Sequence, residues 1–264
     1  MLLDWDRTGT GRTAGIIIAS RNMKIAPAAC FIPRIAHATC LWRCRHRFPA
    51  FRQLRQDKQI SLRRLLCGTR DMTNTSLTFD VKTADRLIWQ GQVVMSRSEA
   101  PYFDELFERV AQVVRPERVL EIGFGLGISA DLIQRRLQPT EHHIVEIDTG
   151  IYADLVRFAG DHRGVVACLG DWRSAPLAAP FDLVFYDPFK YTEEPDDAVR
   201  EAGLLRRLVR NGGALCHPHF GDGPPRVLPG FRTVVLERFK VPKIDMADGT
   251  HCGHAAAVLC YPDD

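Results

Sequence analysis

Apolar residues recur at regular helical and strand spacings from about residue 100 onward. Between Tyr102 and Val114 they fall three and four positions apart, which predicts a helix. The segment 115–117 contains Pro116 and ends that pattern. Short apolar runs then alternate with further helical patterns. The predicted strands cover 118–123, 143–148, 165–169, 181–187, 213–217, 231–239 and 255–261, and further helices cover 129–136, 151–159 and 198–210.

This order of elements predicts an α/β fold. Strands that alternate with helices favour a parallel sheet, because each connection must cross back over the sheet. The last two predicted strands have no helix between them and therefore predict an antiparallel hairpin at one edge. We expect a Rossmann-like fold with a mostly parallel, seven-stranded sheet.

The first 71 residues differ from the rest in charge and pattern. They carry 14 Lys and Arg against 4 Asp and Glu, whereas residues 72–264 carry 21 against 28. Prolines interrupt any period in this basic stretch. A transit-type peptide, a basic nucleic-acid arm and translated upstream sequence before a start at Met72 are the three interpretations, and we favour the last. We expect 1–71 to be a disordered extension and 72–264 to be the folded domain.

Composition and cysteine usage narrow the setting. The chain is 45% hydrophobic and 25% charged, as is ordinary for a globular protein. No apolar run approaches the roughly 18 to 20 residues that a bilayer span needs, and we expect no membrane partner. The eight cysteines form no C-x-x-C pair, so we expect no metal site and a reduced, cytoplasmic setting. Nothing in the sequence indicates an oligomeric state.

A glycine-rich turn follows the first predicted strand of the sheet. Gly123, Gly125 and Gly127 allow tight turning and close approach of the backbone to a ligand. Glu146 ends the next strand, 146 − 123 = 23 residues later, where a carboxylate can accept hydrogen bonds from ribose hydroxyls. NAD-binding and S-adenosylmethionine-binding proteins share both features. Glu121, at the end of the first strand, favours S-adenosylmethionine, unless it only orders the loop.

Two further positions fit an adenosine ligand. Asp171 and Trp172 follow the third predicted strand, where an acid can accept from the adenine amino group and an aromatic ring can stack on the base. The alternative is an ordinary turn aspartate beside a buried tryptophan.

Two carboxylates are candidates for binding a guanidinium. Asp187 ends the fourth strand, at the edge of the sheet where open α/β folds bind ligands. Glu99 lies upstream in a segment that can fold over the cofactor, or it is simply an acid at a helix N-terminus before Pro101. A guanidinium has no free lone pair, so its methylation needs groups that hold the planar cation and accept a proton. Paired carboxylates do both.

The chain from about Gly91 to its C-terminus resembles guanidinoacetate N-methyltransferase and the related arginine N-methyltransferases of fungi and bacteria. Four segments carry this resemblance: 91–102, 119–128, 142–148 and 181–187. It implies a class I methyltransferase fold, S-adenosylmethionine as cofactor and a small guanidino compound as substrate. Glu99 and Asp187 resemble the family's guanidine-binding acids. The positions that resemble or adjoin its cofactor contacts are Met95, Glu121, Gly123, Phe124, Gly125, Leu126, Gly127, Ile128, Glu146, Ile147, Asp171 and Trp172.

Several positions depart from the family pattern. The family commonly has Trp before its guanidine-binding Glu and an acid two residues after the methionine, where this chain has Ser98 and Arg97. Pro188 stands where Thr usually follows the catalytic Asp. The region after the fifth strand is also different, and we expect His217 and His219 there to bind a substrate carboxylate, unless they are plain surface histidines. These departures leave the particular guanidine open.

Two other functions remain as alternatives. The triplet Asp187-Pro188-Phe189 resembles the D-P-P-[FY] signature of enzymes that methylate adenine in nucleic acid. The acidic charge of residues 72–264 disfavours phosphate backbones, so a nucleic-acid partner is not expected. The other alternative is a non-catalytic nucleoside-binding module, against which the presence of both Glu99 and Asp187 argues.

Overall fold

The computed structural model describes residues 76–189 and 198–263. The predicted extension 1–71 and its boundary at Met72 lie outside these ranges. The elements, in chain order, are β1 (Val81–Lys82), β2 (Arg86–Trp89), β3 (Gln92–Ser96), η1 (Arg97–Glu99), α2 (Ala100–Val113), β4 (Arg118–Ile122), α3 (Ile128–Leu132), η2 (Ile133–Leu137), β5 (Glu141–Glu146), α4 (Thr149–Asp161), β6 (Val165–Leu169), β7 (Phe181–Tyr186), α5 (Ala198–Leu208), β8 (Val209–Cys216), β9 (Phe231–Asp245) and β10 (His251–Pro262).

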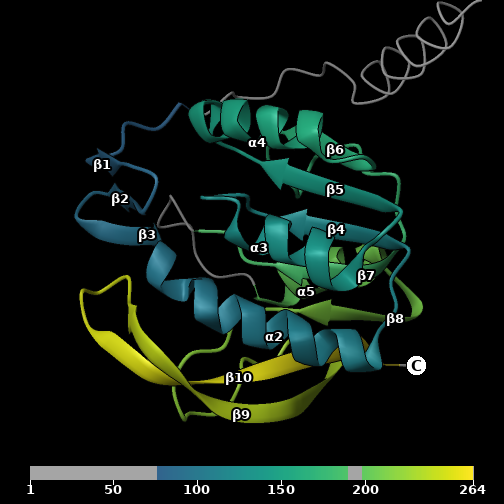
Figure 1. The fold of residues 1–264 in the computed structure, drawn as a ribbon. Helices are drawn as coiled ribbons and strands as arrows, with labels where there is room; N and C mark the ends of the chain where they lie inside the picture. Colours follow the sequence, from purple (N-terminus) through teal and green to yellow (C-terminus); the bar gives the residue numbers. More distant parts are fainter. Residues whose placement is uncertain (1–75, 190–197, 264) are drawn as a thin grey trace, which may run out of the picture. The chain divides into compact units, whose positions relative to one another are not determined.

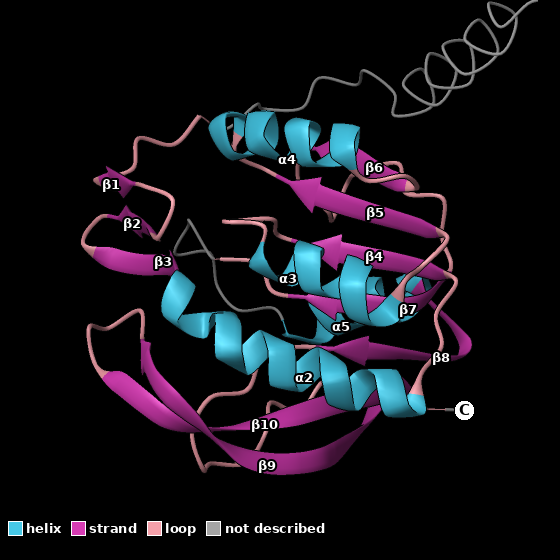
Figure 2. Ribbon diagram, in the orientation of Figure 1, coloured by secondary structure: helices cyan, strands magenta, loops and turns pink. Residues whose placement is uncertain are grey.

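The main sheet has seven strands in the order β6-β5-β4-β7-β8-β10-β9 (Figures 1 and 2). The five strands from β6 to β8 are parallel to their neighbours, whereas β10 runs antiparallel to both β8 and β9. This arrangement confirms the predicted mostly parallel sheet with an antiparallel hairpin at one edge.

Helices cover both faces of the sheet, with α2 and α3 in front of it and α5 behind it in Figure 1. Strand alternation divides the core accordingly. Leu183 and Phe185 of β7 pack in the cluster that includes α2, and Val184 and Tyr186 pack in the cluster that includes α5. Asp187, the next residue, therefore continues the α2 face.

A separate three-stranded sheet, β1-β2-β3, precedes α2 and was not among the predicted elements. Its strands have two to five residues and show no strong alternation of buried and exposed positions. They are held by antiparallel pairing and by a turn at Gln90 and Gly91, both at positive φ. Sequence periodicity does not detect strands this short.

The remaining differences concern the bounds of elements. Strand β9 extends to Asp245, six residues beyond the predicted end, and β8 begins at Val209. The helix after the glycine loop is α3, which passes into the π-helical turn η2 and ends at Gln138 with a left-handed backbone. Within the described residues, no helix is long and apolar enough to cross a membrane.

Candidate active site

The turn between β4 and α3 is shaped by its three glycines, all at positive φ. A Cβ on Gly123 would lie 2.6 Å from the carbonyl oxygen of Asp187, and one on Gly127 would lie 2.8 Å from the Phe124 ring. Gly125 lies against Met95, whose sulfur would be 2.6 Å from an added Cβ. The glycines thus allow both the turn and its close packing on β7 and β3.

Met95 and Glu146 fix the loop from two sides. The backbone N–H of Leu126 lies 3.1 Å from the sulfur of Met95. The carboxylate of Glu146 accepts hydrogen bonds from the backbone N–H groups of Phe124 at 3.1 Å and Asp148 at 2.8 Å. Burial raises the pKa of Glu146 above its usual value, while these backbone bonds oppose that shift.

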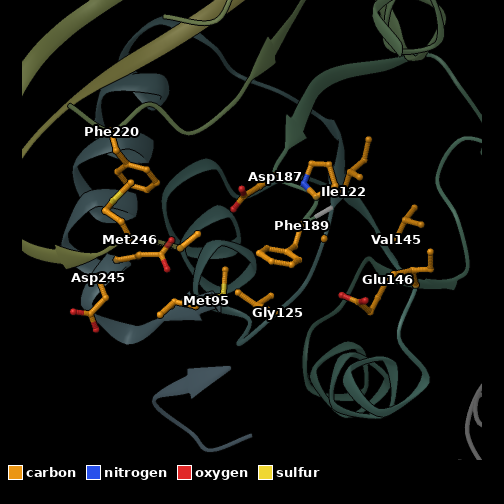
Figure 3. A pocket seen from close by; sticks show the side chains of 17 residues that line it. Met95, Ile122, Gly125, Val145, Glu146, Asp187, Phe189, Phe220, Asp245 and Met246 are labelled. Atoms are coloured by element: carbon orange, nitrogen blue, oxygen red, sulfur yellow. The ribbon is translucent and has the colours of Figure 1, made fainter. Parts of the chain in front are cut away.

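A cavity of about 300 Å³ lies beside this loop. Figure 3 shows Val145 and Glu146 at one end and Phe220, Asp245 and Met246 at the other, with Asp187 and Phe189 between them. The described residues that line it are Val93, Val94, Met95, Glu99, Ile122, Gly123, Gly125, Val145, Glu146, Ile147, Asp187, Pro188, Phe189, Phe220, Asp245, Met246 and Ala247. They include four carboxylates and no Lys, Arg or His.

Asp187 and Glu99 meet in this cavity, although 88 positions separate them in the sequence (187 − 99). Burial, and then the charge of Asp187, raise the pKa of Glu99 to about 8. Burial, and then the charge of Glu121, raise the pKa of Asp187 to about 7. A bound cation would favour the ionised form of both acids, because it offsets the burial and the neighbouring negative charge that raise their pKa values.

The backbone places both acids. Asp187 follows the last residue of β7, and its N–H donates to the carbonyl of Ile122 at 3.1 Å, which ties it to the glycine loop. Glu99 is the N-cap of α2 and has Pro101 directly after Ala100. Glu99 stands at a helix N-terminus and also lines the cavity, so the structure agrees with the interpretation as a helix N-terminal acid and leaves the binding of a guanidinium as a prediction.

Several cavity residues were not anticipated from the sequence. Phe189, Phe220, Asp245 and Met246 add two aromatic rings, a fourth carboxylate and a thioether to the wall. Phe189 was noted only as part of the Asp187-Pro188-Phe189 triplet. Asp245 gave no signal in the sequence. It lies at the end of β9, and the apolar pattern predicted that this strand ends at residue 239.

Glu121 does not reach the cavity. Its side chain is fully buried, its carboxylate accepts a hydrogen bond from the Ser129 hydroxyl, and it lies 3.0 Å from Nε2 of His142. The reason is strand alternation, which points Glu121 into the interior beneath the loop. This position agrees with the alternative prediction, in which Glu121 orders the loop. It does so through the Ser129 hydroxyl and not through backbone N–H groups.

The remaining predicted contacts also lie off the cavity wall. Asp171 is held by Arg173 at the surface, with a shortest contact of 2.8 Å, and Trp172 packs edge-on against Tyr186, 5.5 Å between ring centroids. The loop residues Phe124, Leu126, Gly127 and Ile128 shape the turn without lining the cavity. Of the twelve predicted cofactor contacts, the cavity wall contains Met95, Gly123, Gly125, Glu146 and Ile147.

The two histidines expected at the substrate do not line the cavity either. Nδ1 of His217 lies 2.9 Å from the carbonyl oxygen of Pro218, and the side chain is buried. Nε2 of His219 lies 3.1 Å from the carbonyl oxygen of Gly223. This placement does not agree with the expectation that the two histidines bind a substrate carboxylate in the cavity. Strand alternation directs Cys216 to the α2 face and the next residue, His217, away from it.

The fold and the loop at the end of β4 together define the class. The sheet order, the antiparallel edge hairpin and the glycine-rich turn above β4 are those of a Rossmann-like class I methyltransferase, the class that uses S-adenosylmethionine. The chain belongs to the guanidinoacetate N-methyltransferase family, whose model matches residues 67–218, more than half of the chain.

Individual relatives are more distant. A protein arginine N-methyltransferase 2 of Aspergillus fumigatus is 34% identical over 127 residues, 44% of this chain and 28% of that protein. The protein arginine N-methyltransferase 2 of Emericella nidulans is 31% identical over 127 residues. The chain spans less than a third of the length of these relatives. Among solved structures, the N-methyltransferase NodS of Bradyrhizobium japonicum has a TM-score of 0.49 at 13% identity, covering 63% of this chain and 98% of that one.

Proposed function

We propose that this protein transfers a methyl group from S-adenosylmethionine to a guanidino nitrogen of a small molecule. One observation carries this proposal. Glu99 and Asp187, from segments far apart in the sequence, line one cavity beside the glycine loop, and each bears a raised pKa that a cation would lower. A planar guanidinium offers several N–H donors to such a pair and supplies the missing positive charge.

The cofactor fits the end of the cavity near Glu146. Gly125 and Gly123 leave room for close backbone approach, and Glu146 lines this end, which supports a role for its carboxylate in accepting hydrogen bonds from ribose hydroxyls. When bound, S-adenosylmethionine supplies an electrophilic methyl group on its sulfonium. Met95, packed on Gly125, forms the adjoining wall and restricts where that end of the cofactor can lie.

The acids have different tasks in this proposal. Glu99 holds the guanidinium from the α2 side, and Asp187 orients the reacting nitrogen from the end of β7. A new N–C bond forms as the S–C bond breaks, and the guanidinium gives up one proton. Asp187 accepts that proton, since its pKa of about 7 suits both the ionised form before reaction and proton uptake during it.

The charges of the cavity also bear on the substrate. The described lining residues carry no cation that would pair with a carboxylate. This composition favours guanidines whose acid group is distant from the guanidinium or absent, such as arginine or 4-guanidinobutylamine, over guanidinoacetate. The Aspergillus and Emericella relatives are named as protein arginine methyltransferases, which supports an arginine-type guanidine.

A mass-spectrometric screen tests this function. The full chain is incubated with S-adenosylmethionine and with guanidinoacetate, arginine, 4-guanidinobutylamine and an arginine-containing peptide, and each is followed for the gain of one methyl. We expect methylation of at least one guanidine, with guanidinoacetate poorer than 4-guanidinobutylamine. Absence of methyl gain on every guanidine would contradict the proposal.

A second candidate is methylation of an exocyclic amine on a nucleic-acid base. The observation in its favour is that Asp187, Pro188 and Phe189 all line the cavity, so that the Phe189 ring is available to stack on a base. The acidic charge of residues 72–264 argues against it. Single-stranded oligonucleotides in the same screen decide between the two, and binding of S-adenosylmethionine without any methyl gain would favour the non-catalytic module.

A further inference from the structure

Asp245, the last residue of β9, bonds to residues of β2, β3 and η1 at the end of the cavity away from Glu146 (Figure 3). Its Oδ2 accepts hydrogen bonds from the Arg86 guanidinium of β2 at 2.5 Å and from the Ser96 hydroxyl at 3.1 Å. Its backbone N–H donates to the Ser98 hydroxyl at 3.1 Å. Asp245, Arg86, Ser96 and Ser98 are called the Asp245 clasp below. The clasp fastens the β1-β2-β3 sheet to the edge hairpin.

The clasp continues directly to Glu99. The backbone N–H of Ser96 donates to Oε1 of Glu99 at 2.7 Å, in a capping box at the start of η1. The Ser98 hydroxyl lies 2.9 Å from the Ser96 hydroxyl and completes the connection. Ser96 thus fixes Glu99 through its backbone and is itself fixed by Asp245 through its side chain.

Burial makes this connection difficult for water to replace. Ser96 is 3% exposed and Glu99 is 9% exposed, so a lost partner leaves a polar group without solvent access. Burial opposes ionisation of Asp245, but the Ser96 hydrogen bond and the Arg86 charge hold its pKa below the usual value. Asp245 therefore remains an acceptor at neutral pH.

Ser98 makes a second connection between η1 and β9. Its hydroxyl accepts from the backbone of Asp245 and lies against Ser96. A tryptophan, which the resembled family commonly carries at this position, has only an N–H donor and cannot accept that bond. The serine that this chain has in place of the tryptophan therefore makes a contact between η1 and β9 that a tryptophan cannot make.

We infer that Asp245 is a positioning residue that holds Glu99 in the geometry required to bind the guanidinium. This inference rests on the proposed function for the role of Glu99, but the clasp has a structural readout of its own. Without Asp245, the Ser96 hydroxyl loses the carboxylate that accepts its hydrogen bond and keeps only its contacts with Ser98, so that η1 loosens and Glu99 samples other positions. The expected loss is in substrate binding, because the cofactor end of the cavity lies away from the clasp (Figure 3).

The test compares Asp245→Ala with Asp245→Asn and with Asp248→Ala as matched control. Asp248 accepts two bonds from Thr250 in the turn of the same hairpin and lies outside the clasp. We expect Asp245→Ala to raise the KM for the guanidine about tenfold, as for one or two lost buried hydrogen bonds, with the KM for S-adenosylmethionine unchanged. Asp245→Asn retains an oxygen acceptor for Ser96 and should stay within about threefold of wild type. Asp248→Ala should not change either KM.

Hydrogen exchange of residues 96–99 is the second readout. Asp245→Ala should accelerate exchange there. Ser98→Ala removes only the bonds of one hydroxyl and should accelerate exchange more weakly. It serves as the test variant if Asp245→Ala does not fold. The inference is overturned if both variants keep the exchange rate and the guanidine KM of the wild type. If Asp245→Ala is unfolded, the same result in Ser98→Ala alone overturns it. Faster exchange in a protein that methylates no guanidine would keep the clasp and reject the proposed function.

Discussion

The carboxylate of Asp187 is the single group on which the proposed proton transfer depends. Replacing it with Asn preserves shape but removes both the charge and the capacity to accept a proton. We expect Asp187→Asn to lower kcat about 10²-fold or more, the usual range for a lost acid–base group. Affinity for S-adenosylmethionine, measured by calorimetry, should change little. Near-normal turnover of the best guanidine by Asp187→Asn would contradict the assignment.

Glu99 should contribute mainly to binding. Glu99→Gln retains an oxygen for the Ser96 N–H but loses the charge that faces the cation. We therefore expect a higher guanidine KM with a smaller effect on kcat than in Asp187→Asn. The contrast between these two variants, measured with the same substrate, separates a group that holds the cation from a group that accepts its proton.

The raised pKa values of the two acids predict a pH dependence of substrate binding. With values near 8 for Glu99 and near 7 for Asp187, the free site retains protons at neutral pH. A bound guanidinium lowers both pKa values, so binding expels protons and the KM for the guanidine should fall as pH rises from about 6 to 9. Calorimetry in buffers of different ionisation enthalpy measures the released protons. Proton uptake on binding would be the opposite sign and would refute this electrostatic account.

At the scale of elements, the loop between β4 and α3 limits which side chains it tolerates. Gly125 has a φ of +54°, and its added Cβ would lie 2.6 Å from the Met95 sulfur. We expect Gly125→Ala to weaken S-adenosylmethionine binding about tenfold, because backbone strain and displacement of Met95 act together. Gly160→Ala in α4, where no heavy atom lies within 4 Å of the new Cβ, is the matched control. Equal affinity in both variants would show that the loop does not contact the cofactor.

The elements also show how far periodicity reaches. Long, strongly patterned segments such as α2 and the core strands of the sheet were predicted correctly, since their buried faces repeat at 3.6 or 2 residues. The sheet β1-β2-β3 was missed because its strands are too short to repeat. Residues at strand ends, such as Asp187, were found because the carboxyl edge of a parallel sheet binds ligands. Asp245 was missed because its strand continues beyond its apolar pattern.

At the scale of the whole molecule, the independence of the basic N-terminal stretch is still a prediction. A chain that begins at Met72 is expected to keep its cooperative thermal transition and its methyl transfer, because residues 1–71 show no pattern of a core. Thermal denaturation and the methylation assay on both lengths measure this. Loss of the transition in the shorter chain would place the basic stretch within the folded domain.

The sequence by itself determined the α/β class, the glycine turn and the position of Asp187 at a strand end, whereas Glu99 was singled out by the family resemblance. The first three follow from local patterns, namely hydrophobic period, glycine spacing and an acid at an element end. Only the tertiary structure decided which residues share the cavity. Strand alternation pointed Glu121 into the core and His217 away from the α2 face, and the hairpin delivered Asp245 to the far end of the cavity. Such outcomes depend on the direction of each side chain and on contacts between distant segments, and neither is encoded in spacing along the chain.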